Sequence, residues 1–173
     1  MTGIVGFGTA TDPQALKLET RARRWVKNVL RPETAPVLMS IRVTVALGAC
    51  PAARNVSLST VYNCYGLAFA ARRSAIVDEE DVQTILHDDE YRRLPWDPAA
   101  WLPGDIVAYR TDTGDLAHVG VISRIDVDLT NPEFRVLVRS AWGDSGEYDH
   151  PIDQVPILLG KPTEVFAQRF LAP

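Results

Sequence analysis

Residues 61–70, VYNCYGLAFA, place one cysteine directly before a short apolar segment that favours a helix over residues 64–73. Asn63 precedes this segment, and asparagine is a good N-terminal cap; a hydroxyl residue just upstream is the alternative cap. A cysteine at this position lies near the positive end of the helix dipole, which favours the nucleophilic thiolate. Cys64 is therefore the candidate nucleophile, and its alternative role is that of a small buried apolar side chain.

The overall composition indicates an ordinary globular protein. Of the 173 residues, 46% are hydrophobic and 23% are charged, which suits a single domain. The formal net charge of −4 gives no general attraction to nucleic acid or to an anionic membrane surface. No apolar run approaches the ~20 residues of a membrane span, and the first residues lack the pattern of a secretory signal. We therefore expect a cytoplasmic location for the chain as written, with non-classical export as the alternative.

The domain organisation follows from the order of the sequence patterns. We predict one domain over residues 1–173, with an irregular arm at 1–10, a helical or extended region at 11–59 and a core at 60–173.

Three segments make up the region before the core. Asp12 and Pro13 suit a helix start, and apolar residues recur at helical spacing until Arg31, so we predict a helix there with a solvated basic face. Residues 36–47 are apolar and β-branched, and their pattern fits either a strand or a buried helix. Residues 48–59 are expected to form a loop.

The second half of the chain has the alternation and turn signals of an antiparallel meander. An acidic segment at residues 78–81 favours a short surface helix that ends near His87. Strands are predicted at residues 106–109, 117–125 and 134–141, followed by a polar loop at 142–150 and a closing edge strand or short helix at 164–170. Helices followed by antiparallel strands predict the α+β class.

The two cysteines, Cys50 and Cys64, are too few for a disulfide framework. One alternative is a disulfide between these two residues. In the other alternative both thiols are free, and Cys50 is expected to have no chemical role. The three histidines and two cysteines show no spacing typical of zinc ligands. We predict neither a metal nor another cofactor.

Several short sequence blocks, taken in their order along the chain, resemble the NlpC-type branch of the papain-like cysteine peptidases and amidases. The blocks are NCYGLA at residues 63–68, LPGDIV at 102–107 and HVGVI at 118–122. The segment SAWGDSGEYDHP at residues 140–151 is also similar to a "SKWGxxGxYxH" segment of a poorly characterised papain-like branch, some members of which are attached to bacterial toxins. The resemblance implies an NlpC-type fold, with the nucleophile helix packed on a small antiparallel sheet.

The resemblance also implies roles for individual residues. Cys64 would be the nucleophile and His118 the base of a cofactor-independent amide hydrolysis, often in peptidoglycan peptides. The family's third polar residue falls on Ser140, which orients a histidine poorly. Asp144, Glu147 or His150 would then reach in from the following loop, and we favour His150 because the similar segment carries a histidine there. Trp142 is expected to line the cleft or the core.

Departures from the family pattern at Asn63, Tyr65 and Ser140 support a different class of function. Asn63 stands where the family has aspartate, and Tyr65 stands where it has a small residue. These two residues are candidate orienting or cleft residues in an enzyme, and the same departures favour a non-catalytic binding or immunity-type module. A cysteine-dependent acyltransferase is a further, less favoured hypothesis. The expected partners are a peptide or peptidoglycan-like substrate and a partner protein for delivery or inhibition.

Overall fold

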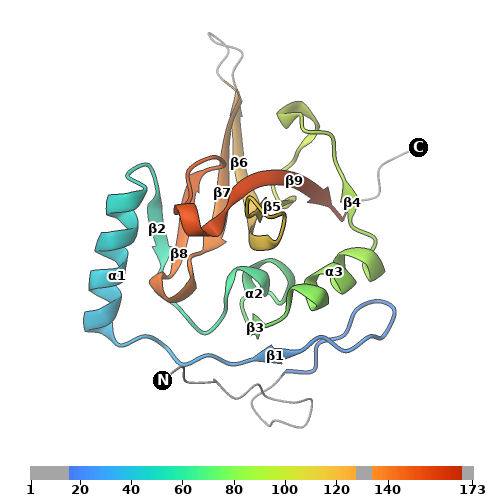
Figure 1. The fold of residues 1–173 in the computed structure, drawn as a ribbon, viewed down its shortest axis with the longest axis horizontal. Coiled ribbons are helices and arrows are strands. Elements are labelled where there is room, and N and C mark those ends of the chain that lie inside the picture. Colours follow the sequence, from blue (N-terminus) through green and yellow to red (C-terminus); the bar gives the residue numbers. More distant parts are fainter. Residues whose placement is uncertain (1–15, 128–133, 169–173) are drawn as a thin grey trace.

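The computed structural model describes residues 16–127 and 134–168, and it has a mixed α+β architecture (Figure 1). The predicted class is therefore confirmed. In chain order the elements are β1 (Asn28–Val29), α1 (Pro36–Ala49), β2 (Arg54–Ser57), α2 (Cys64–Phe69), β3 (Ala75–Ile76), α3 (Glu79–Asp88), β4 (Arg92–Arg93), β5 (Ile106–Arg110), β6 (Leu116–Val127), β7 (Phe134–Ala141), β8 (Glu147–Pro151) and β9 (Lys161–Ala167). Short 3-10 helices lie at η1 (Pro98–Ala100), η2 (Gly143–Ser145) and η3 (Ile157–Leu159).

The main sheet has seven strands in the order β2-β8-β7-β6-β5-β9-β4, and β1 pairs with β3 in a separate small sheet. Every neighbouring pair is antiparallel. The predicted strands at residues 106–109, 117–125 and 134–141 correspond to β5, β6 and β7, which are adjacent in the sheet. Strands β6 and β7 extend well beyond their neighbours (Figure 1).

Successive side chains of a strand point to opposite faces of the sheet, and the two faces have different hydrophobic clusters. Ile106, Ala108 and Val119 pack in the cluster that also contains residues of α2 and α3. Val107 and Tyr109 lie in a second cluster, with side chains from the loop after β4 and from β7 and β9. The sheet is thus covered on both faces.

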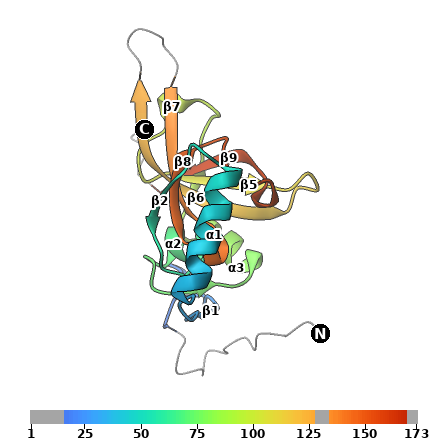
Figure 2. The same ribbon diagram turned by 90° about the vertical axis from the view of Figure 1, so that its left-hand side faces the viewer.

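Helix α1 begins with Pro36 in its first turn, a position that suits proline because no helical N–H is needed there. It lies in front of the sheet beside β2 and β8 (Figure 2). Ala46 packs with Cys50, Trp142 and Tyr148. The segment at residues 36–47 is therefore a helix, although it lies at the surface and is not the buried element considered above.

The predicted N-terminal helix is wrong for the residues that the structure describes. A turn and an isolated bridge between Glu19 and Trp25 stand in its place. The Thr20 hydroxyl donates to Asp88 Oδ2 at 2.6 Å, and Arg23 has a φ of 63°, which a helix excludes. A contact with α3, distant in sequence, therefore overrides the local helical spacing. The predicted arm and the start of this helix lie outside the described residues.

Two predicted loops contain strands. Strand β2 lies within residues 48–59, and β8 (Glu147–Pro151) takes up the end of the predicted loop at 142–150 and continues to Pro151. These two strands pair through Arg54 and Asp149, so the region before the core contributes to the main sheet. Strand β9 confirms a strand near residues 164–170, but it lies between β5 and β4 and is not an edge.

Candidate functional site

Cys64 is the first residue of α2, and Asn63 caps this helix as predicted. The side-chain oxygen of Asn63 accepts the Gly66 N–H at 2.9 Å and the Ile76 N–H at 3.2 Å. Its amide nitrogen donates to the Ile76 carbonyl at 2.7 Å. Asn63 therefore fastens α2 to β3, and its polar atoms are used in this structural role.

The Cys64 thiol is buried, with the residue 9% exposed. Burial raises the pKa of this thiol to about 11, although backbone N–H groups, including that of Val119, act in the opposite direction. A thiol with this pKa is protonated at neutral pH and is a weak nucleophile. Cys50 and Cys64 are both free and buried, which excludes a disulfide between them.

His118 points away from Cys64. It pairs with Tyr109 across β5 and β6, and directly paired residues share a face of the sheet. The rings of Tyr109 and His118 are 5.4 Å apart, whereas Val119, the next residue, lies in the cluster of Cys64. His118 is 1% exposed, and its Nε2 has no hydrogen-bond partner among the residues that the structure describes. Burial, and then the neighbouring His150, lower the pKa of His118 to about 3.

His150, Ser140 and Trp142 form a buried hydrogen-bonded chain. His150 Nδ1 lies 2.8 Å from the Pro151 carbonyl oxygen, which only accepts, so this nitrogen carries the proton. His150 Nε2 then accepts from the Ser140 hydroxyl at 2.9 Å, and Trp142 Nε1 donates to the same hydroxyl at 2.9 Å. Burial lowers the pKa of His150 to about 4. Both ring nitrogens are engaged, so neither is free to orient His118.

The structure thus brings some of the sequence-predicted site residues together and separates others. His118, His150, Ser140 and Trp142 lie on one face of the sheet, and Cys64 lies with α2 on the other. The expected contact between the Cys64 thiol and the His118 ring is not formed. The physical reason is strand alternation, since Val119, and not His118, points towards α2.

The remaining candidates have structural partners. Tyr65 donates its hydroxyl proton to the Leu116 carbonyl at 2.9 Å and is buried. Asp144 forms ion pairs with Arg31 and Arg42, and thereby connects η2 to α1 and to the segment before it. Neither side chain is directed at the thiol in a catalytic arrangement.

Glu147 is a buried carboxylate that sequence analysis left as a minor candidate in a loop. Tyr62 donates to its Oε2 at 2.7 Å, and Arg72 donates to both of its oxygens at 2.9 and 3.1 Å. Arg139 Nε lies 3.5 Å from Oε1. These donors come from segments far apart in the chain, so only the fold reveals that Glu147 connects β8 to the region around α2.

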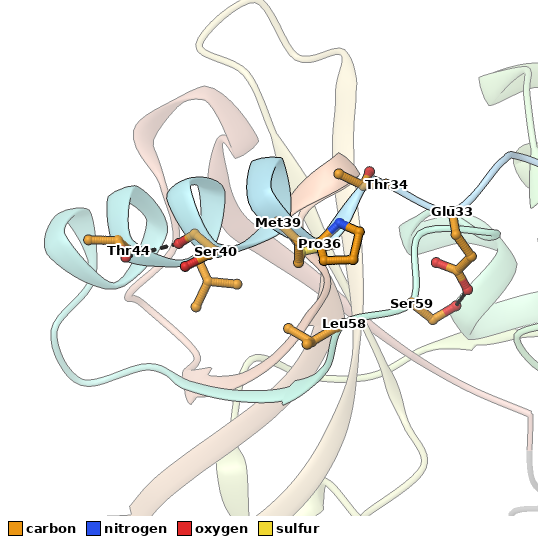
Figure 3. Close-up of a pocket in the computed structure, with 9 residues that line it drawn as sticks. Glu33, Thr34, Pro36, Met39, Ser40, Thr44, Leu58 and Ser59 are labelled. Carbon is orange, nitrogen blue, oxygen red and sulfur yellow. Dashed lines mark hydrogen bonds between the residues drawn. The ribbon is translucent and has the colours of Figure 1, made fainter.

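A cavity of about 540 Å³ lies along α1 (Figure 3). Apolar side chains from α1 and from the segment after β2 line it, including Pro36, Met39 and Leu58. Hydroxyl groups and the Glu33 carboxylate lie around the apolar part. The Ser59 hydroxyl donates to Glu33 Oε1 at 2.8 Å. Sequence analysis missed this site, although the unusual density of apolar residues at 36–47 was its signal.

The described residues contain no group of three or more histidine, cysteine, aspartate or glutamate side chains that could hold a metal ion. In the same part of the chain, no helix has the length and apolar character needed to cross a membrane. In comparisons with known proteins, the chain matches no family model, and neither curated proteins nor solved structures give a match. The resemblance to NlpC-type domains therefore stays a prediction.

Proposed function

We propose that this chain is a non-catalytic binding module that docks an apolar segment of a partner protein along α1. The observation that carries the proposal is the exposed apolar surface of this helix beside a cavity. Val37, Leu38, Ile41 and Val45 are 51–75% exposed. Three of them, at positions 37, 41 and 45, follow the four-residue spacing that places side chains in one row of a helix.

The chemistry of the two predicted catalytic residues supports a binding role over hydrolysis. A thiol hydrolase needs a thiolate with a base in hydrogen-bonding reach. Here burial favours the neutral thiol of Cys64, and His118 lies on the opposite face of the sheet. Hydrolysis would require a rearrangement that brings both groups to one side.

The size of α1 sets the length of the segment that it would bind. Its 14 residues span roughly 20 Å at about 1.5 Å per residue, the length of a four-turn helix. Contiguous apolar surface of this kind is typical of protein-interaction sites, whereas scattered exposed apolar residues are not. An amphipathic helix laid along such a surface is a common mode of peptide recognition.

Charge defines the partner further. The only charged residue in α1 is Arg42, and Asp144 pairs with it. Glu33 stands at one end of the cavity, and hydrogen bonds from Thr60 and Ser59 lower the pKa of its carboxyl group. The Glu33 carboxyl group is therefore ionised at neutral pH. The residue is also exposed. The complementary partner is an apolar segment with a basic residue at one end.

Binding of labelled model peptides tests the proposal. The probes are an amphipathic helical peptide of leucine and lysine and a matched peptide of leucine and glutamate, followed by fluorescence anisotropy. We expect saturable binding of the lysine peptide and weaker binding of the glutamate peptide. Ile41→Asp and Leu58→Ser should each weaken binding roughly tenfold or more, because each removes apolar contact area at the site.

Ile157→Asp is the matched control, because Ile157 is also apolar and highly exposed but lies in η3. An equal loss of binding in this variant would indicate non-specific hydrophobic binding and contradict the proposal. Light scattering across a concentration series provides a second measurement. A dimer that Ile41→Asp abolishes would assign the surface to a second copy of the chain and overturn the hetero-partner proposal.

A further inference from the structure

A second cavity, separate from α1 and from the buried histidines, has an unusual concentration of arginines. Its volume is about 500 Å³, and Arg54, Arg124, Arg135, Arg139 and Asp149 are among the residues that line it. The arginines come from three strands, β2, β6 and β7. The chain as a whole carries a formal net charge of −4, so this positive site is a local feature.

The carboxylates nearby neutralise only part of the positive charge. Asp149 accepts from Arg139 Nε at 2.8 Å and Nη2 at 2.9 Å, and from Arg54 at 3.2 Å. Burial acts to raise the pKa of Asp149, but the hydrogen bonds from these arginines bring it below its usual value. Arg124 pairs with Asp126 at 3.0 Å. Glu147 Oε1 lies 3.5 Å from Arg139 Nε. Four guanidinium groups thus face three carboxylates.

Several N–H donors remain available to a ligand. A guanidinium group has five N–H donors in a fixed planar arrangement. Arg139 uses Nε and Nη2 on Asp149, while its Nη1 has no hydrogen bond to another described residue. Arg135 has no ion pair with any other residue that the structure describes, and it is exposed at the cavity. Arg54 and Arg139 are held in place by Asp149, so part of the site is preorganised.

We infer that this cavity binds a small phosphorylated molecule. Guanidinium groups match phosphate oxygens through paired hydrogen bonds, which favours phosphate over a single carboxylate. The volume lies within the range of small-molecule sites, roughly 300–1,000 Å³. Ala52 and Leu137 add an apolar portion to the lining, which suits a ligand with an organic group attached to its phosphates. The site is independent of the α1 surface.

Calorimetric titration with pyrophosphate, ADP and citrate tests the inference. We expect saturable binding of pyrophosphate and tighter binding of ADP, whose organic group would contact Ala52 and Leu137. Arg135→Gln and Arg124→Gln should each weaken binding about tenfold. These two arginines are chosen because they do not hold Asp149, and thermal unfolding would verify that each variant is folded.

Arg92→Gln is the control, since Arg92 is an exposed arginine on β4 at the opposite edge of the sheet. Its binding constants should equal those of the wild type. An equal loss in Arg92→Gln would mean non-specific attraction and overturn the inference. Citrate binding as tight as that of ADP, or no saturable binding of any probe up to millimolar concentration, would overturn it as well.

Discussion

The buried histidines predict that this protein loses stability in mildly acidic solution. The pKa values of His118 and His150 are lowered in the folded state, to about 3 and about 4 respectively. In the unfolded chain both should return to the ordinary value of ~6.5. Below that pH the unfolded chain takes up two protons that the folded protein does not, so acid favours unfolding.

The size of the effect follows from these pKa values. Each histidine should lower the free energy of unfolding by about 1.4 kcal/mol for each pH unit below ~6.5, until the pH reaches the pKa of that histidine in the folded state. At pH 5 this amounts to about 2 kcal/mol for each histidine and about 4 kcal/mol for the pair. The full stability is present above ~6.5 and is lost progressively as the pH falls towards 4. Four kcal/mol is a large part of the ~5–15 kcal/mol that stabilises a typical domain.

Urea unfolding followed by tryptophan fluorescence at pH 8, 7, 6 and 5 would measure this loss. His118→Leu should reduce the loss between pH 8 and 5 to about 2 kcal/mol, because one titrating group is removed. This variant also removes a buried nitrogen that has no hydrogen-bond partner in the described part of the chain, so its stability at pH 8 should not fall strongly. His87→Gln is the control, since the His87 side chain is 83% exposed. A wild type equally stable at pH 8 and 5, or a His118→Leu variant with an unchanged pH dependence, would refute the reasoning.

Three further predictions concern single residues. Cys64 should react with iodoacetamide at pH 7 roughly two orders of magnitude more slowly than a free thiol, because its pKa of about 11 lies above the ~8.5 of free cysteine. Mass spectrometry would follow the reaction. A rate above that of glutathione would contradict the conclusion that Cys64 is a buried, protonated thiol. Glu147→Gln should lower the unfolding free energy by about 2 kcal/mol, because it weakens the hydrogen bonds that the buried carboxylate accepts from Tyr62 and from the partly exposed Arg72. Asp112→Asn, at an 89% exposed carboxylate, should change it by less than ~0.5 kcal/mol; similar losses in urea unfolding would argue against a central role for Glu147. Gly66→Ala should lower the unfolding free energy by more than ~2 kcal/mol, since an added Cβ would lie 1.8 Å from the Ser74 carbonyl oxygen. The control is Gly48→Ala in α1, where an added Cβ meets nothing within 4 Å. This variant should be neutral or stabilising in the same assay.

The parts of the fold that were predictable are those with local causes. The strands at residues 106–109 and 134–141 are rich in apolar and β-branched residues, and turn signals in the chain itself precede them. The helix start at Asn63 has a local cap, and the acidic residues in the first turn of α3 suit the helix dipole. Each of these preferences acts within a few residues, so a single sequence is enough to detect it.

The errors arose where distant partners decide the local structure. Strand β8 carries Glu147, Asp149 and His150, a polar composition that indicates a loop in isolation. Arginines and Ser140 satisfy these side chains in the fold, so the segment forms a strand. The region around Thr20 has helical spacing, but its hydroxyl bonds to α3.

The sequence by itself determined the α+β class, the central antiparallel strands and the position of Cys64 at the start of a capped helix. Only the tertiary structure decided which face of the sheet this helix covers. Neighbouring residues of a strand point in opposite directions, so a choice between the two faces exchanges His118 for Val119 beside α2. That choice depends on the packing of every element around the sheet, and here it places Cys64 and His118 on opposite faces.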